Sequence, residues 1–256
     1  MQINYSLRSQ FTGEHSVIHK SRIEMSFTDD TIDVFVALGK GVYSVGQDIV
    51  LGAERTGEGL GLGSDGRVAT IGYENRAMVS IVEDFVKYGI SDHRSPLYKS
   101  IVHVLEHYYS YFPDQVITAL AKQAGIGAGY TVGRMVIGKK LATAVATRIA
   151  MAIAASAAYK QIAKRIGVSA GASATGIGTP IGLLMMQGFM QRSSHASMRL
   201  RSKSPKLYSV LQRNGDLQLL YFLLEKPLDK YIQAISTAER NNAQFEGAIK
   251  RKYKLN

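Results

Sequence analysis

The sequence contains no cysteine. Disulfide scaffolds, thiolate zinc sites and cysteine nucleophiles are therefore excluded. The phosphate-binding loop of nucleotide hydrolases is also missing. Because 46% of the residues are apolar and 20% are charged, the composition is that of a folded protein held together by packing.

A pattern typical of a secretory leader is also missing. The segment that begins at Met1 has no basic stretch followed by an apolar run, so we expect no cleavable secretory leader. We therefore expect a protein that is cytoplasmic in the cell that produces it. If it is secreted, the route does not depend on a signal peptide.

Acidic residues are missing from the middle of the chain, where no aspartate or glutamate lies between Asp114 and Asp216. Fourteen of the 31 lysines and arginines fall in this stretch, whereas the rest of the chain has 17 basic and 20 acidic residues. The formal net charge of +11 therefore comes from the middle segment. Such a basic excess is typical of proteins that bind nucleic acid or an anionic membrane surface.

Strand signals are scarce, and helical spacing of apolar residues dominates. One helix is predicted over 75–88, with Gly89 as its stop. Serine–proline pairs at 95–96 and 204–205 each place a capping residue before a proline at the first helical position. The predicted fold class is all-α, a helical bundle that encloses a glycine- and alanine-rich hydrophobic hairpin.

A glycine-rich run at 57–66 predicts a linker or loop. It contains the G-x-G-x-x-G spacing of dinucleotide sites, but no convincing strand precedes it, as that fingerprint requires. We divide the chain at this run. Residues 1–66 form an N-terminal region with a helix near 28–51 and the linker, and residues 67–256 form a helical domain.

Small residues recur every four positions in the central segment, residues 115–191. This spacing places a flat seam on one side of a helix and lets a second helix approach closely. Alanine-rich stripes also occur in ordinary helix bundles, so the stripe by itself fits a purely structural role equally well. The predicted seams comprise Gly125, Gly129 and Gly133, then Gly138, Ala142, Ala146, Ala150, Ala154 and Ala158, and then Gly178 and Gly182.

Residues 166–191 carry no charge and are flanked by basic residues. Roughly 20 apolar residues span a bilayer core, so the length is sufficient. Serines, threonines and glycines make the stretch more polar than a permanent anchor, and Pro180 breaks or kinks a helix. Arg148 in the preceding helix costs roughly 2.5–3.5 kcal/mol at the centre of a span. We therefore expect a conditionally inserting, membrane-active hairpin within 115–191.

Two alanine- and glycine-rich arms, 141–159 and 166–190, are joined by the basic segment 160–165. This pattern resembles the buried hydrophobic hairpin of colicin-type pore-forming domains. The leaderless, cysteine-free chain is also similar in kind to ion-conducting effectors of the type VI secretion system. The resemblance implies that surrounding helices, predicted over 75–112 and 205–240, keep the hairpin soluble.

The resemblance further implies a pore-forming antibacterial effector that inserts the hairpin into the inner membrane of a target cell and depolarises it. Implied partners are an anionic lipid membrane, the secretion machinery, a membrane-embedded immunity protein and further copies of the chain in the membrane. No cofactor and no enzymatic activity are expected. The basic residues expected to attract anionic lipid are Lys139, Lys140, Lys160, Lys164, Arg165, Arg192, Arg199 and Arg201.

Two alternatives remain. Residues 103–107, His-Val-Leu-Glu-His, match the H-x-x-E-H motif of zinc peptidases, with His103 and His107 as candidate ligands on one helix face. The motif family needs a further acidic ligand downstream, and none occurs before Asp216. The other alternative is a basic structural protein that binds membranes or nucleic acid, in which the aromatic residues at 108–112 stack on bases.

Overall fold

The computed structural model describes residues 45–62, 67–89, 91–126, 133–156 and 179–253. Within these ranges every regular element is helical, which confirms the all-α fold class. The helices are α2 (Val45–Gly59), α3 (Arg67–Tyr88), α4 (Pro96–Tyr109), α5 (Asp114–Gln123), α6 (Arg134–Ala155), α8 (Thr179–Lys203), α9 (Pro205–Arg213), the 3-10 turn η1 (Leu217–Leu220), α10 (Tyr221–Leu224), α11 (Asp229–Arg240) and α12 (Asn242–Lys252).

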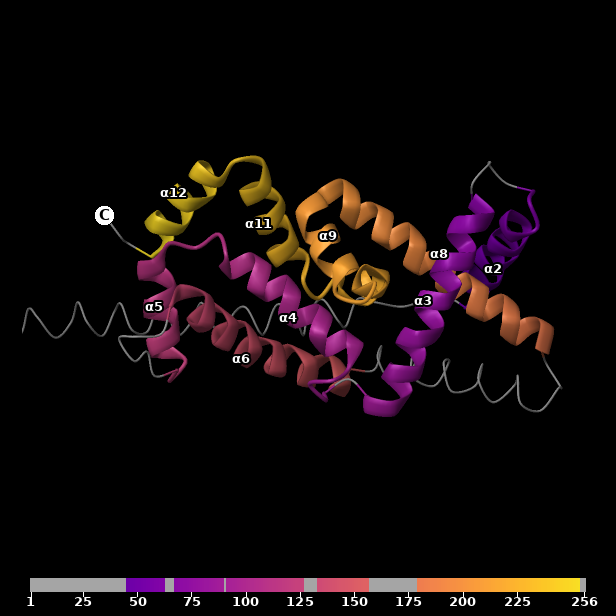
Figure 1. The fold of residues 1–256 in the computed structure, drawn as a ribbon, viewed down its shortest axis with the longest axis horizontal. Coiled ribbons are helices and arrows are strands. Elements are labelled where there is room, and N and C mark those ends of the chain that lie inside the picture. The colour runs from indigo at the N-terminus through magenta and orange to yellow at the C-terminus, as the bar shows by residue number, and fades with distance from the viewer. Residues whose placement is uncertain (1–44, 63–66, 90, 127–132, 157–178, 254–256) are drawn as a thin grey trace, which may run out of the picture.

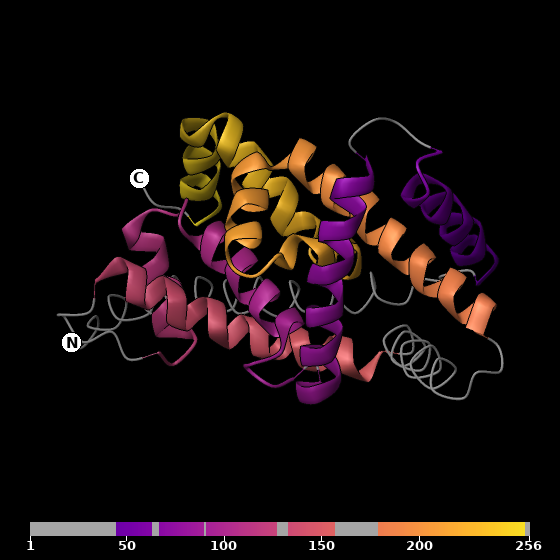
Figure 2. The same cartoon turned by 45° about the vertical axis from the view of Figure 1, so that its right-hand side comes forward.

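The helices form a layered bundle around α4 (Figures 1 and 2). On one side α6 runs along α4, with α5 packed at its end. On the other side α11 packs on α4 and carries α12. The long α8 leaves this bundle toward the opposite end of the molecule, where α2 lies against it. The division of the chain into two domains at residue 66 stays a prediction.

Two serine–proline pairs begin helices where the sequence predicts. Ser95 precedes α4 and Ser204 precedes α9, each followed by proline at the start of the helix. The predicted capping by the serine side chains is wrong, because neither accepts a hydrogen bond from its helix. Proline fits there because the first helical N–H has no partner within the helix. Gly89 follows α3 with a φ of +67°, a left-handed conformation that glycine adopts without steric cost and that ends the helix.

The region of α2 and α3 differs from the prediction at one end of each helix. The loop predicted over 57–66 is partly helical, because α2 continues to Gly59 and Leu60 still donates to the carbonyl of Thr56 at 3.0 Å. α3 begins at Arg67, well before the predicted start at residue 75. Its first turns expose large apolar side chains, so their hydrophobic periodicity is weak and sequence patterning misses them.

The core is centred on α4. Leu97, Ile101, Val104 and Leu105 of this helix are fully buried, and their neighbours in the core come from α6 and the C-terminal helices. Each fully buried leucine, isoleucine or valine contributes roughly 1.5–3 kcal/mol relative to an exposed one. The bundle is therefore held mainly by α4, and any helix that leaves it gives up apolar contacts of this size.

The aromatic cluster at the end of α4 packs into the interior of the protein. The ring of Tyr108 lies 5.1 Å from that of Tyr231 and 6.4 Å from that of Phe245, measured between centroids. Tyr109 and Phe112 are buried. These rings join α4 to α11 and α12, which is a packing role.

Candidate functional site

The small-residue stripe of α6 is the buried side of that helix. Ala142, Ala146 and Ala150 are each at most 1% exposed, and α6 packs along α4 and against α5 (Figure 1). Because alanine has no side chain beyond Cβ, the two helix backbones approach closely along this seam. At the ends of the stripe Gly138 and Ala154 are half-buried, and Ala158 lies outside the described residues.

Larger apolar side chains flank the alanine seam and hold α6 in place. They are Ile137, Leu141, Val145, Ile149 and Ile153, all buried. Tyr98 of α4 adds polar contacts, because its hydroxyl lies 3.0 Å from Thr147 Oγ1 and 3.4 Å from the carbonyl oxygen of Thr143. At roughly 1.5–3 kcal/mol for each large residue, the five side chains contribute about 10 kcal/mol to keeping α6 in the bundle.

The opposite side of α6 is exposed and carries positive charge. We call it the outer face of α6 and define it by Val136, Lys140, Thr143, Thr147 and Met151, all of which are exposed. Lys139 and Arg148 are also exposed and lie at its two opposite edges. No acidic residue occurs in α6. The structure thus places Arg148 at the surface of the folded protein, together with two of the lysines that we expect to attract anionic lipid. α6 is a two-faced helix.

Two of the three glycines predicted to form the first packing seam, Gly125 and Gly133, do not lie within a helix, and the structure corrects the prediction for them. Gly125 follows α5 in a turn with a φ of +69°, and Gly133 precedes α6 as its N-terminal cap. A Cβ added at either glycine would meet nothing within 4 Å. Gly125 therefore serves to end a helix, a function of glycine that the four-residue spacing does not distinguish from packing. Gly129 lies outside the described residues.

Several residues of the predicted hairpin lie outside the described part of the chain. They are Lys160, Lys164 and Arg165 of the basic connecting segment and Gly178 of the second arm. Pro180 lies in the first turn of α8, where a missing N–H costs no helical hydrogen bond, and Gly182 follows in the same helix. The hairpin as a whole stays a prediction, because its turn is not among the described residues. Where the structure is described, no helix is long and apolar enough to cross a membrane.

The middle of α8 is tied to α2 and α3 by buried polar contacts. The fully buried Arg55 donates from Nη1 to Glu74 Oε2 at 2.9 Å and to Gln191 Oε1 at 3.2 Å. Arg67 donates from Nη2 to Gln191 Oε1 at 3.2 Å and to Ser194 Oγ at 3.3 Å. Ser194 in turn donates to Glu74 Oε1 at 2.8 Å. We call these five residues the buried polar network.

Burial sets the electrostatics of this network. Desolvation lowers the pKa of the Arg55 guanidinium, while the hydrogen bond from Arg55 to Glu74 opposes that change. An arginine buried this deeply depends on its carboxylate partner, because a lone charge in the interior is costly. The network therefore couples α8 to α2 and α3, although α8 is distant from both in the sequence.

Arginines at the C-terminal end of α8 are engaged within the fold. Arg199 forms a two-point ion pair with Glu225, with its shortest distance 2.6 Å. Desolvation raises the pKa of Glu225, but the ion pair with Arg199 outweighs it, so the pKa lies below its usual value. Arg201 lies 5.7 Å from the centroid of the Tyr208 ring, and Arg192 is half-buried. These three residues, predicted to bind lipid, thus also serve packing within the protein.

The histidines of the H-x-x-E-H motif have protein partners. His103 Nδ1 lies 3.1 Å from Glu106 Oε2, and His107 Nε2 lies 3.2 Å from Glu239 Oε1. Burial lowers the pKa of His107, an effect that Glu239 only partly offsets. Among the described residues, no group of three or more histidine, aspartate or glutamate side chains is arranged to hold a metal ion.

Glu239 is the acidic partner that sequence reasoning misses. It accepts from the backbone N–H of Leu207 at 3.1 Å and of Lys206 at 3.3 Å, and from the hydroxyl of Ser204. These donors form the N-terminus of α9, where a carboxylate is favoured by the unpaired N–H groups and the helix dipole. Glu239 therefore caps α9. No sequence signal links it to His107, 132 positions away.

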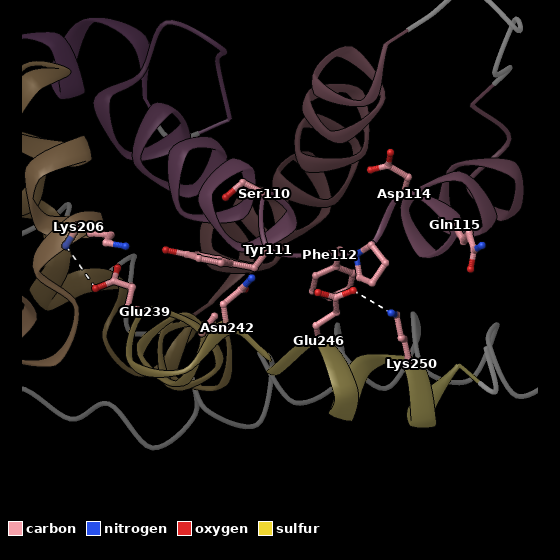
Figure 3. A pocket seen from close by; sticks show the side chains of 12 residues that line it. Ser110, Tyr111, Phe112, Asp114, Gln115, Lys206, Glu239, Asn242, Glu246 and Lys250 are labelled. Atoms are coloured by element: carbon pink, nitrogen blue, oxygen red, sulfur yellow. Dashed lines mark hydrogen bonds and ion pairs between the residues drawn. The ribbon is translucent and has the colours of Figure 1, made fainter. Parts of the chain in front are cut away.

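An open cleft of about 790 Å³ lies beside this carboxylate. Figure 3 shows Tyr111, Glu239 and Lys206 gathered on one side of the cleft, and Glu246 with Lys250 on the other. Glu246 and Lys250 form an ion pair of 2.9 Å. The charged groups of the cleft thus engage one another or cap a helix, an arrangement that supports the fold.

Comparisons with protein-family models, with curated proteins and with solved structures find no match to this chain. The observations that bear on function are therefore the burial, the contacts and the charge of the described helices.

Proposed function

We propose that the protein is a pore-forming antibacterial effector that inserts helices of its central segment into the inner membrane of a target cell and depolarises it. The observation that supports this most directly is the two-faced α6. Its small-residue stripe is sheltered under α4, its outer face is basic, and the helix contains no acidic residue. A helix in an ordinary soluble bundle needs only the sheltered stripe, and it needs neither a basic outer face nor a lack of acidic residues.

Insertion requires α6 to leave α4. The large apolar side chains that it withdraws from the core regain an apolar environment in lipid, so the loss of about 10 kcal/mol of burial is largely offset. The alanine seam then becomes available to other helices in the membrane, where small residues allow the closest packing. Lys139, Lys140 and Arg148 are costly when they face lipid, so they turn toward a water-filled path or the membrane surface.

The contacts of α8 suggest where the inserting segment ends. From Gln191 onward α8 is held by the buried polar network, by the hydroxyl of Ser193 on the carbonyl of Leu219 and by the Arg199–Glu225 ion pair. Withdrawing Gln191 and Ser194 would take hydrogen-bond partners from the buried Arg55 and from Glu74, and a buried charge that loses its partners is costly. In this mechanism the chain beyond residue 190 stays with the soluble helices while the preceding part inserts.

The proposal is tested first with the purified wild-type chain. We expect it to release ions from vesicles that contain anionic lipid and, on delivery to the periplasm of bacteria, to collapse the membrane potential reported by a voltage-sensitive dye. A protein that binds no vesicles and leaves the potential unchanged would refute the function. Co-expression of a membrane-embedded immunity protein is expected to protect the cells.

The release of α6 is tested with a cross-link between α4 and α6. The chain has no native cysteine, so Tyr98→Cys with Thr147→Cys provides one unique pair for a short bifunctional thiol reagent with a reducible spacer. We expect the cross-linked protein to bind vesicles without releasing ions, and reduction to restore release. Each single cysteine variant treated with the reagent is the control. Equal ion release before and after reduction would show that α6 does not need to leave α4.

A further inference from the structure

We infer that the outer face of α6 is the surface by which the still folded protein binds an anionic lipid bilayer, with α6 lying in the plane of the interface. This inference rests on the proposed function for the choice of a membrane as target. It concerns a step before insertion, so it can fail while pore formation stands.

The geometry of α6 fits an interfacial helix. Val136, Lys140, Thr143, Thr147 and Met151 recur every three or four positions and are all exposed, so they follow one side of the helix. Apolar side chains are present at both ends of this side. Val136 and Met151 are 48% and 53% exposed, respectively. Exposed methionine and valine beside basic residues form the amphipathic surface that lies between lipid headgroups and acyl chains.

Charge determines the kind of bilayer. Lys140 belongs to this face, Lys139 and Arg148 lie at its two edges, and the sequence from 115 to 215 contains no acidic residue that would repel a negative surface. Basic groups near an anionic leaflet each strengthen binding, whereas a zwitterionic surface offers them little attraction. The face therefore fits a membrane rich in anionic lipid.

The large exposed side chains of the face favour lipid over nucleic acid. Single-stranded nucleic acid is bound by basic grooves that also present aromatic rings for base stacking. The outer face presents methionine and valine instead, while Tyr109 and Phe112 are buried in the interior. Methionine and valine enter an acyl layer readily and do not stack on bases.

The arrangement of the bundle allows this approach. Figures 1 and 2 show α6 on one side of α4 and α11 on the other, and α4 contacts both. A bilayer on the outer face of α6 would therefore meet α6 first and leave α11 and α12 directed away from it. The stripe of Ala142, Ala146 and Ala150 would stay packed in the core until insertion.

The test uses tryptophan as a probe, because the chain has none of its own. Met151→Trp places it on the outer face, and Val79→Trp on α3 is a matched control, since the native side chains are 53% and 51% exposed. With vesicles of phosphatidylglycerol and phosphatidylcholine, we expect the emission of the tryptophan at 151 to shift to shorter wavelength and to be quenched by brominated lipid. The tryptophan at 79 should change little.

Charge-reversal variants distinguish binding through the outer face of α6 from a general attraction between the positively charged protein and anionic vesicles. Lys139→Glu with Lys140→Glu is expected to weaken binding to these vesicles roughly 20-fold or more. Arg251→Glu with Lys252→Glu on α12 makes the same change in net charge at exposed positions and should have a much smaller effect. Circular dichroism of both variants confirms that they are folded.

Three outcomes would overturn the inference. They are an equal response of the two tryptophans, an equal loss of binding in the two charge variants, and a response of the tryptophan at 151 to random DNA in place of vesicles. If vesicles release ions while any of these results holds, docking through α6 is wrong and the proposed function remains. If the outer face binds as expected and no ions are released, the proposed function fails and docking remains.

Discussion

Replacing Ala146 by leucine tests the packing of α6 on α4. Ala146 is fully buried in the middle of the stripe, and leucine would add three carbon atoms where two helices approach closely. Overpacking of a filled core costs typically 1–3 kcal/mol. We therefore expect Ala146→Leu to lower the free energy of unfolding by about 2 kcal/mol.

The matched control is Ala155→Leu, the same exchange at an exposed position of the same helix. Surface substitutions of this kind are usually within about 0.5 kcal/mol of neutral. For a chain of this size, a loss of about 2 kcal/mol lowers the melting temperature by roughly 4–8 °C. Urea denaturation followed by circular dichroism measures both variants. Equal stability of the two would refute the close approach of α6 and α4 along the alanine seam.

Two further predictions concern the buried charges. Glu74→Gln leaves Arg55 buried without its carboxylate and should cost about 3–5 kcal/mol of stability, measured by denaturant unfolding, while the exposed Glu54→Gln should be nearly neutral. Burial lowers the pKa of His107 in the folded state, so His107 binds a proton more readily in the unfolded state. Its contribution to stability is therefore lost as the pH falls through its unfolded pKa near 6.5. His107→Gln should therefore flatten the fall in stability between about pH 7.5 and 5.5, measured by denaturant unfolding at a series of pH values.

Local sequence signals predict where several helices begin and end. The serine–proline pairs begin α4 and α9, and Gly89 ends α3, because capping and proline geometry act within one turn. The same local reasoning fails at Gly125, which follows α5 in a left-handed turn, and at Gly133, which is the N-terminal cap of α6. A four-residue spacing does not show whether a glycine lies within a helix or at its end.

The contacts that define the candidate site depend on residues distant in the chain. Arg55 is fully buried, and it bonds to Glu74 and Gln191 from two other helices. His107 reads as a metal ligand, yet it faces Glu239, which caps α9. Such pairings depend on how the helices pack against one another. The sequence around a side chain does not indicate which distant residue it will contact.

By itself, the sequence determined three properties: an all-α chain, a basic and acid-free middle, and a stripe of small residues at helical spacing on α6. These follow from composition and from periodicities of a few residues, which the backbone imposes locally. The tertiary structure decided that Ala146 lies against the core while Lys140 and Met151 face outward. Which side of α6 is buried depends on the helices that pack against it, because apolar area is buried by contact between elements and not within a single helix.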